Sequence, residues 1–133
     1  MIKAFIPINP EFVLYKKALK NMYEESQEKL CDPNDFEFVC NNTLFYGFAD
    51  EEGLIGGIYF FKDSDKLFMN GFAGRKHFDK NIECVKLSLS WFNCDIYAEA
   101  QNKASALCLL RSGFKRVKGN LFVYKQGQKP GKD

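Results

Sequence analysis

The sequence predicts an α/β fold, in which a mixed, mostly antiparallel sheet carries helices on both faces. Three apolar runs at 43–49, 54–62 and 67–73 are separated by two short polar turns, which indicates an antiparallel meander. Two other segments repeat their apolar residues at spacings of 3, 4 and 3, as amphipathic helices do. A strand follows the second of these helices, so the order favours a right-handed crossover ending in a parallel pair of strands.

The N-terminal part is predicted to form a short strand at 3–8 and one long helix. The helix begins at Asn9, because this residue is a suitable cap and a proline and an acid follow it. Its buried stripe is expected to consist of Phe12, Tyr15, Leu19 and Met22. The helix should reach about Lys29 and end before the break at 32–34, which leaves room for one good helix before the meander.

Helix signals resume after Gly74 and continue to about Asn93. The buried stripe of this helix is expected to consist of Ile82, Val85, Leu89 and Phe92. A strand at 95–100 follows and should lie parallel to the strand at 67–73. Gly71 is predicted to mark a bulge in that neighbouring strand, or to make room for an aromatic ring.

The last elements are a short helix and a hairpin. Asn102 is expected to cap the helix and Gly113 to end it. The core side of the helix is predicted to consist of Leu107, Leu110 and Phe114. Strands at 114–118 and 121–126 flank a Gly-Asn pair, which is typical of a hairpin turn.

One domain is expected over 1–126, followed by a disordered tail at 127–133. No apolar run reaches the ~18 residues that span a bilayer, and the N-terminal residues do not resemble a secretory signal. The five cysteines form no CxxC pair, and the chain has one histidine. We therefore expect a cytoplasmic protein without a metal site and without a membrane partner.

Charge is distributed unevenly along the chain. Residues 11–65 contain twelve acids and five lysines, whereas residues 103–133 contain eight bases and one acid. The basic end is interpreted either as a solvated face with a tail or as a surface for a phosphate-rich ligand. Nucleic acid is an unlikely partner by sequence, because no basic-aromatic recognition motif is present.

The spacing from Asn102 to the pair Gly113-Phe114 resembles the last motif of the GNAT superfamily, the acyl-CoA-dependent N-acyltransferases. In that family an Asn opens a helix of about three turns and a Gly-Phe pair ends it. The predicted order of elements is also similar over nearly the whole chain. The resemblance implies a GNAT-like fold, acetyl-CoA or another acyl-CoA as donor, and a small-molecule or protein amine as acceptor.

The resemblance also implies where the donor binds. Its pyrophosphate would lie on the loop at 74–80, at the N-terminus of the next helix. Phe78 and Lys80 stand where the family's loop has small residues, and Asp79 adds a negative charge. The cofactor-binding residues implied in this way are Phe72, Ala73, Gly74, Arg75, Lys76, His77, Lys80 and Asn102.

The catalytic residues implied are Glu99, as general base, and Tyr97, which shares its face of the strand. Glu99 is also open to interpretation as a strand-end carboxylate paired with a lysine. Many family enzymes place a tyrosine as general acid at the position of Leu109, and leucine has no proton to give.

Two functions therefore stay open. The first is a divergent N-acyltransferase with weak or degenerate activity. The second is a non-catalytic GNAT-fold protein that binds a protein partner, since the chain is similar in size and pattern to small phage proteins of this fold associated with virion morphogenesis. A fold resemblance alone does not decide between them.

Overall fold

The computed structural model describes residues 1–30, 32–74 and 78–126, and its frame is a mixed sheet. The strands are β1 (Lys3–Phe5), β2 (Leu44–Asp50), β3 (Gly53–Asp63), β4 (Lys66–Ala73), β5 (Ile96–Glu99), β6 (Lys115–Lys118) and β7 (Leu121–Tyr124). The helices are α1 (Pro10–Leu30), α2 (Phe36–Asn42), α3 (Phe78–Leu89) and α4 (Lys103–Arg111). The predicted tail at 127–133 lies outside the described residues. Within those residues, no helix is long and apolar enough to cross a membrane.

The order of strands in the sheet is β1-β2-β3-β4-β5-β7-β6. β2, β3 and β4 form the predicted antiparallel meander. β4 and β5 are parallel neighbours, with Leu67 opposite Ile96 and Phe68 opposite Tyr97. The remaining pairs are antiparallel. The mixed, mostly antiparallel sheet with one parallel pair is therefore confirmed.

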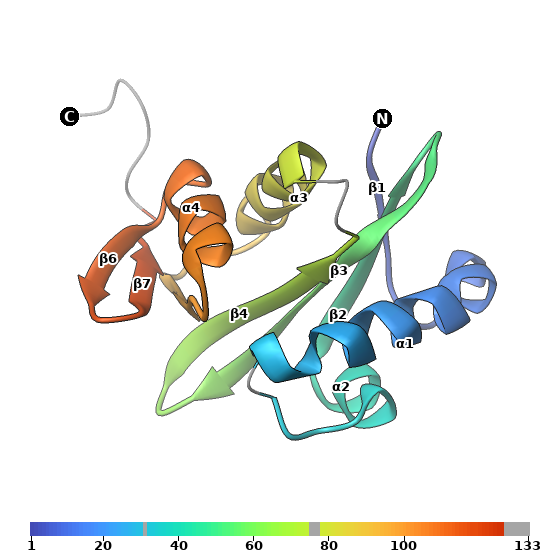
Figure 1. Cartoon of the computed structure of the whole chain (residues 1–133), viewed down its shortest axis with the longest axis horizontal. Helices are drawn as coiled ribbons and strands as arrows, with labels where there is room; N and C mark the ends of the chain where they lie inside the picture. The colour runs from blue at the N-terminus through green and yellow to red at the C-terminus, as the bar shows by residue number, and fades with distance from the viewer. Residues whose placement is uncertain (31, 75–77, 127–133) are drawn as a thin grey trace.

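Helices cover both faces of the sheet, as Figure 1 shows: α1 and α2 on one face, α3 and α4 on the other. The face under α1 and α2 is filled by aromatic rings, among them Phe12, Tyr23, Phe36, Phe45, Tyr59 and Phe72. The face under α3 and α4 is filled mainly by aliphatic and phenylalanine side chains, among them Ile58, Phe60, Val85, Leu89 and Phe122. Because strand side chains alternate, the three strands of the meander, β2, β3 and β4, supply both cores.

The prediction of one helix before the meander is wrong, because α2 is a second one. The carboxylate of Asp35 accepts a hydrogen bond from the Phe38 N–H at 2.8 Å and caps it. Phe36 and Val39 are its buried residues. A helix of seven residues spans only two turns, too few for an apolar period to stand out in the sequence.

The first strand is shorter than the predicted 3–8, since β1 ends at Phe5. The Ile6 N–H donates to the side chain of Asn9 at 2.8 Å, and the Asn9 N–H donates to the Ile6 carbonyl at 2.9 Å. These two bonds form a turn that ends the strand before α1 begins. The Asn9 side chain therefore bonds a backbone N–H of the turn before α1, whereas the side chain of a helix cap accepts from an N–H in the first turn of the helix.

The predicted core side of α4 is wrong for two of its three residues. Leu107 is 41% exposed and Leu110 is 48% exposed, whereas Phe114 is buried as expected. The buried residues of this helix are Cys108 and Leu109. The spacing of the largest apolar side chains therefore predicted the wrong buried face, because Leu107 and Leu110 face outward.

Gly71 does not mark a bulge. Its strand pairs with β3 without a break in register, from Gly56 opposite Ala73 to Asp63 opposite Lys66. A Cβ at Gly71 would lie 3.3 Å from the Gly57 carbonyl oxygen and 3.3 Å from Ile58 Cγ1, so the neighbour is not an aromatic ring either. The register shifts of the sheet lie instead between Phe48 and Ala49 of β2 and between Arg116 and Lys118 of β6.

Candidate active site

β4 and β5 separate after only two residue pairs. The pairing ends at Phe68 and Tyr97, although β4 continues to Ala73 and β5 to Glu99. The Gly74 N–H donates to the Ile55 carbonyl of β3 at 3.1 Å. In an antiparallel ladder the bonding direction alternates, so the N–H groups of Gly71 and Ala73 point away from β3, towards the gap beside β5. The edge of β4 is thus open where the two strands diverge.

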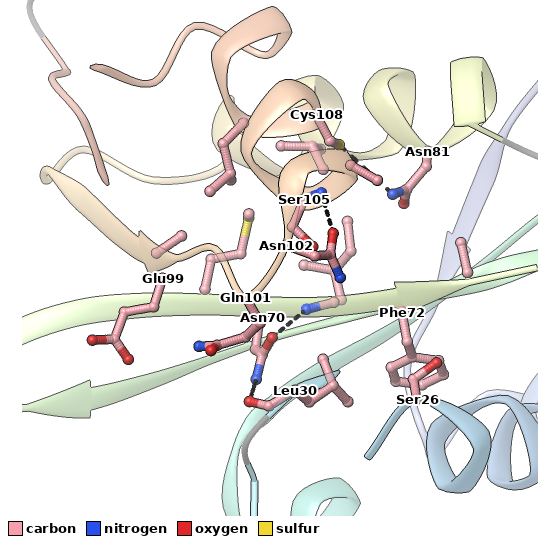
Figure 2. A pocket seen from close by; sticks show the side chains of 18 of the residues that line it. Ser26, Leu30, Asn70, Phe72, Asn81, Glu99, Gln101, Asn102, Ser105 and Cys108 are labelled. Atoms are coloured by element: carbon pink, nitrogen blue, oxygen red, sulfur yellow. Dashed lines mark hydrogen bonds between the residues drawn. The ribbon is translucent and has the colours of Figure 1, made fainter. Parts of the chain in front are cut away.

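A cavity of about 310 Å³ lies at this gap, mainly under α3 and α4, and Ser26 and Leu30 of α1 also line it from the other face of the sheet. β4 lines it from Met69 to Ala73, and α3 contributes Asn81 and Val85. From α4 it receives Ser105, Cys108 and Leu109 (Figure 2). The cavity therefore offers an open strand edge on one side and mostly small or apolar side chains on the other.

A second cavity, of about 360 Å³, lies on the face of α1 and α2. Its lining includes the loop between these helices and the strand residues Tyr59, Phe61 and Phe68. The residues that line both cavities are Leu30, Met69, Asn70, Glu99 and Gln101. The two cavities therefore share part of their lining at the gap between β4 and β5, one lying mainly under α3 and α4 and the other under α1 and α2.

Asn70 connects the two cavities through hydrogen bonds. Its Oδ1 accepts from the Gly71 N–H at 3.0 Å, at the open edge of β4. Its Nδ2 donates to the Tyr59 hydroxyl at 3.0 Å, and that hydroxyl donates to Asp32 Oδ2 at 2.8 Å. Burial and the nearby Asp32 raise the pKa of Tyr59, so its hydroxyl keeps its proton. The polar chain is thereby fixed in one arrangement.

No family model and no curated protein matches the sequence. Solved structures do match nearly the whole chain. An N-acetyltransferase from Staphylococcus aureus Mu50 is 15% identical with a TM-score of 0.72, and the match covers 96% of this chain and 99% of that one. The chain has the GNAT fold. An aminoglycoside 6′-acetyltransferase type Ii is 13% identical with a TM-score of 0.54, over 98% of this chain and 99% of that one.

The predicted cap of the last GNAT helix is confirmed. Asn102 Oδ1 accepts from the Ser105 N–H at 2.8 Å and opens α4. Figure 2 shows this bond at the cavity under α3 and α4, which Asn102 also lines. The same residue thus starts the helix and lies where the resemblance implies the donor.

Only some of the other residues implied to bind the cofactor line this cavity. Phe72, Ala73 and Gly74 line the cavity of about 310 Å³, although the Phe72 ring packs in the aromatic core. Arg75, Lys76 and His77 lie outside the described residues. Lys80 does not line the cavity, since its Nζ lies 2.8 Å from Asp50 and 2.6 Å from Glu52. Two carboxylates therefore already hold this lysine.

Glu99 lies at the end of β5 and lines both cavities. Figure 2 places it at one end of the first cavity, away from Asn81 and Cys108. Tyr97 lies on the same side of β5, because Ile96 and Ala98 face the opposite core. Its ring packs 5.8 Å from that of Phe68, and it lines neither cavity. Leu109 does line the first cavity and is 6% exposed.

Sequence reasoning missed Asn70, Gln101 and Arg111. Asn70 is the one polar side chain within the apolar run of β4, which was a usable signal. The Arg111 guanidinium carbon lies 5.7 Å from the centre of the Phe78 ring, at the first residue of α3. Nothing in the sequence places the end of α4 beside the start of α3, so this pair depends on the fold.

The ion pairs of Lys80 make stability depend on pH. The hydrogen bond from Lys80 lowers the pKa of Asp50, and the two carboxylates raise the pKa of Lys80. A lowered carboxyl pKa stabilises the fold above the unfolded value of about 4 and ceases to do so as the pH falls through the folded value. The lysine contributes below its unfolded value of about 10.4 and loses this contribution as the pH rises through the folded value.

We expect Asp50→Asn to lower the free energy of unfolding at neutral pH and to have a much smaller effect once the pH has fallen below the lowered pKa of Asp50, because the wild-type carboxyl is then protonated too. Urea unfolding at a series of pH values measures the difference. Asp63→Asn, at the exposed end of β3, is the matched control. An effect of Asp50→Asn that is the same at both pH values would show that the ion pair is not its cause.

Proposed function

We propose that this protein is a GNAT-like N-acyltransferase that moves an acyl group from an acyl-CoA to an amine. The observation that carries the proposal is that two cavities share part of their lining at the gap between β4 and β5. Such a gap lets a donor in one cavity and an acceptor in the other approach the same point. That the similar solved structures are N-acetyltransferases supports the same reading.

The donor would occupy the cavity under α3 and α4. The N–H groups of Gly71 and Ala73 point to the gap and suit the amide and carbonyl oxygens of an extended acyl-pantetheine arm. A carbonyl oxygen at Gly71 would compete with the side chain of Asn70, which accepts this N–H at 3.0 Å. Arg111, beside the start of α3, adds positive charge for the phosphates, and the loop at 75–77 stays a prediction for the same role.

The acceptor would enter from the cavity under α1 and α2. Its neutral amine nitrogen attacks the thioester carbonyl, so a C–N bond forms and the C–S bond breaks. Glu99 takes the proton that the nitrogen loses, because it is the carboxylate that lines both cavities. The departing thiolate takes a proton from water, since Leu109 has none to give, and Glu99 returns its proton to the hydroxide formed. The products are an amide and free CoA.

The test is calorimetric titration with acetyl-CoA, followed by a thiol-release assay across a panel of amines. Binding in the micromolar range with thiol release supports the proposal. The absence of a heat of binding at millimolar acetyl-CoA would contradict the proposal and favour the second candidate, a GNAT-fold module that binds protein. Two observations favour that candidate. Leu109, which lines the cavity, has no acidic proton to donate to a leaving thiolate, and Lys80 forms ion pairs with Asp50 and Glu52, where a donor phosphate would have to compete.

A bulky side chain in the first cavity should block the donor. We expect Ser105→Phe to raise the dissociation constant for acetyl-CoA about ten- to a hundredfold, since forced overpacking costs about 1–3 kcal/mol and 1.4 kcal/mol is a factor of ten. Leu107→Phe is the control on the same helix, because Leu107 is 41% exposed and does not line the cavity. Equal affinities in both variants and the wild type would exclude this cavity as the donor site.

A further inference from the structure

The cavity under α1 and α2 is lined by two carboxylates, those of Asp32 and Glu99. Among the described residues, no lysine, arginine or histidine lines it, and none forms an ion pair with either acid. The negative charge of this cavity is therefore not neutralised by the described part of the chain. A ligand that fits must supply positive charge.

Asp32 is held in a fixed orientation. Its Oδ2 accepts from the Tyr59 hydroxyl at 2.8 Å, and its Oδ1 accepts from the Asn34 N–H at 2.9 Å. The loop is fixed in turn by Gln27, whose Nε2 donates to the carbonyls of Asp32 and Asn34 at 3.0 and 2.9 Å. A carboxylate offers about four lone-pair directions, and hydrogen bonds from the described residues use two of them.

Aromatic rings complete the lining. Phe61 and Phe68 stack with centroids 5.8 Å apart, and Tyr59 lies beside Phe61 at 6.1 Å. Phe38 of α2 also lines the cavity and is 46% exposed. The faces of aromatic rings attract cations and also pack against methylene groups. Together with the two acids they suit an alkyl chain that carries ammonium groups.

The volume favours a small ligand. About 360 Å³ is near the lower end of the range of roughly 300–1,000 Å³ found for small-molecule pockets. Of the two acids, Glu99 lines both cavities and Asp32 only this one. A reacting amine at Glu99 therefore leaves Asp32 to face a second group of the same molecule.

We infer that the acceptor is a small aliphatic diamine or polyamine, which presents one amine at Glu99 and a second, charged amine at Asp32; this assignment rests on the proposed N-acyl transfer. The hydroxyl of Tyr59 and the amide of Asn70 hold the receiving carboxylate in place. A monoamine of equal length would leave Asp32 without a partner. The second ammonium group is thus the feature by which the site selects its substrate.

The experiment compares putrescine with n-butylamine, which has the same carbon chain and lacks the second amine. With the full chain and acetyl-CoA, kcat/KM should be about ten- to a hundredfold higher for putrescine, the range for one hydrogen bond to a charged group. Asp32→Asn should remove this preference by bringing kcat/KM for putrescine down to about that for n-butylamine. Glu37→Gln, on the exposed side of α2, removes the same charge and should preserve the preference.

Equal kcat/KM for the two amines, or an Asp32→Asn effect that is the same for both, would overturn the assignment while leaving N-acyl transfer in place. Preference for a lysine-containing peptide would overturn it too. If no amine is acylated and acetyl-CoA does not bind, N-acyl transfer itself fails. Calorimetry with putrescine alone then decides: binding that Asp32→Asn abolishes supports the diamine site, and no binding by the wild type overturns it.

Discussion

Replacing Glu99 with Gln should lower the rate of amine acylation by about 10²–10⁴-fold, the range for loss of a general base. Glutamine keeps the shape of the side chain and cannot take the proton of the attacking amine. Glu99 lies where the two cavities meet, so no other carboxylate of the described residues lines both of them. The measurement is thiol release at saturating acetyl-CoA with the best amine of the panel.

Glu83→Gln is the matched control, because Glu83 is an exposed acid on α3 that lines neither cavity. Calorimetry should give the same affinity for acetyl-CoA in the wild type and both variants, which separates the chemical step from donor binding. A Glu99→Gln enzyme that keeps more than about a tenth of the wild-type rate would exclude Glu99 as the base.

Replacing Phe36 with Ala should cost about 3–5 kcal/mol of unfolding free energy, the range for deleting a buried aromatic ring. Phe36 is fully buried, and its ring lies 5.7 Å from Phe45 and 5.9 Å from Tyr23. The Phe36 ring packs α2 against the aromatic core, and α2 in turn lines the acceptor cavity. Urea unfolding measures the loss.

Phe38→Ala is the control, on the same helix and with the same atoms removed. Phe38 is 46% exposed, so its removal should change the unfolding free energy by less than about 1 kcal/mol. A loss for Phe36→Ala no larger than that for Phe38→Ala would mean that α2 is not anchored through this ring. The comparison thereby tests the helix that the sequence did not reveal.

Much of the fold could be predicted because its signals are local. The meander follows from three apolar runs with polar turns, and the parallel pair follows from one strand, one helix and one strand. The cap at Asn102 depends only on its own helix. The buried face of α4 could not be read in the same way, because Cys108 faces the core while the larger Leu107 and Leu110 face out.

The candidate site was less predictable because its parts come from distant segments. Glu99 follows from its place at the end of a strand, and the family resemblance directed attention to it. Asp32, in contrast, lies in a break between helices and reads in the sequence only as a helix stop. Its contact with Tyr59 joins residues 27 positions apart. Only the folded sheet brings that loop to the gap beside Asn70.

The short pairing of β4 with β5 has a consequence for how the molecule opens. Two residue pairs join the part of the sheet formed by β1 to β4 to the part formed by β5, β7 and β6. Within each part, neighbouring strands form antiparallel ladders of at least three residue pairs, so the seam between the parts is the weakest line of backbone bonding. Amide protons along this seam should therefore exchange through small separations of the two parts rather than through global unfolding. A ligand lying in the gap would bridge both parts and bind them into one cooperative unit.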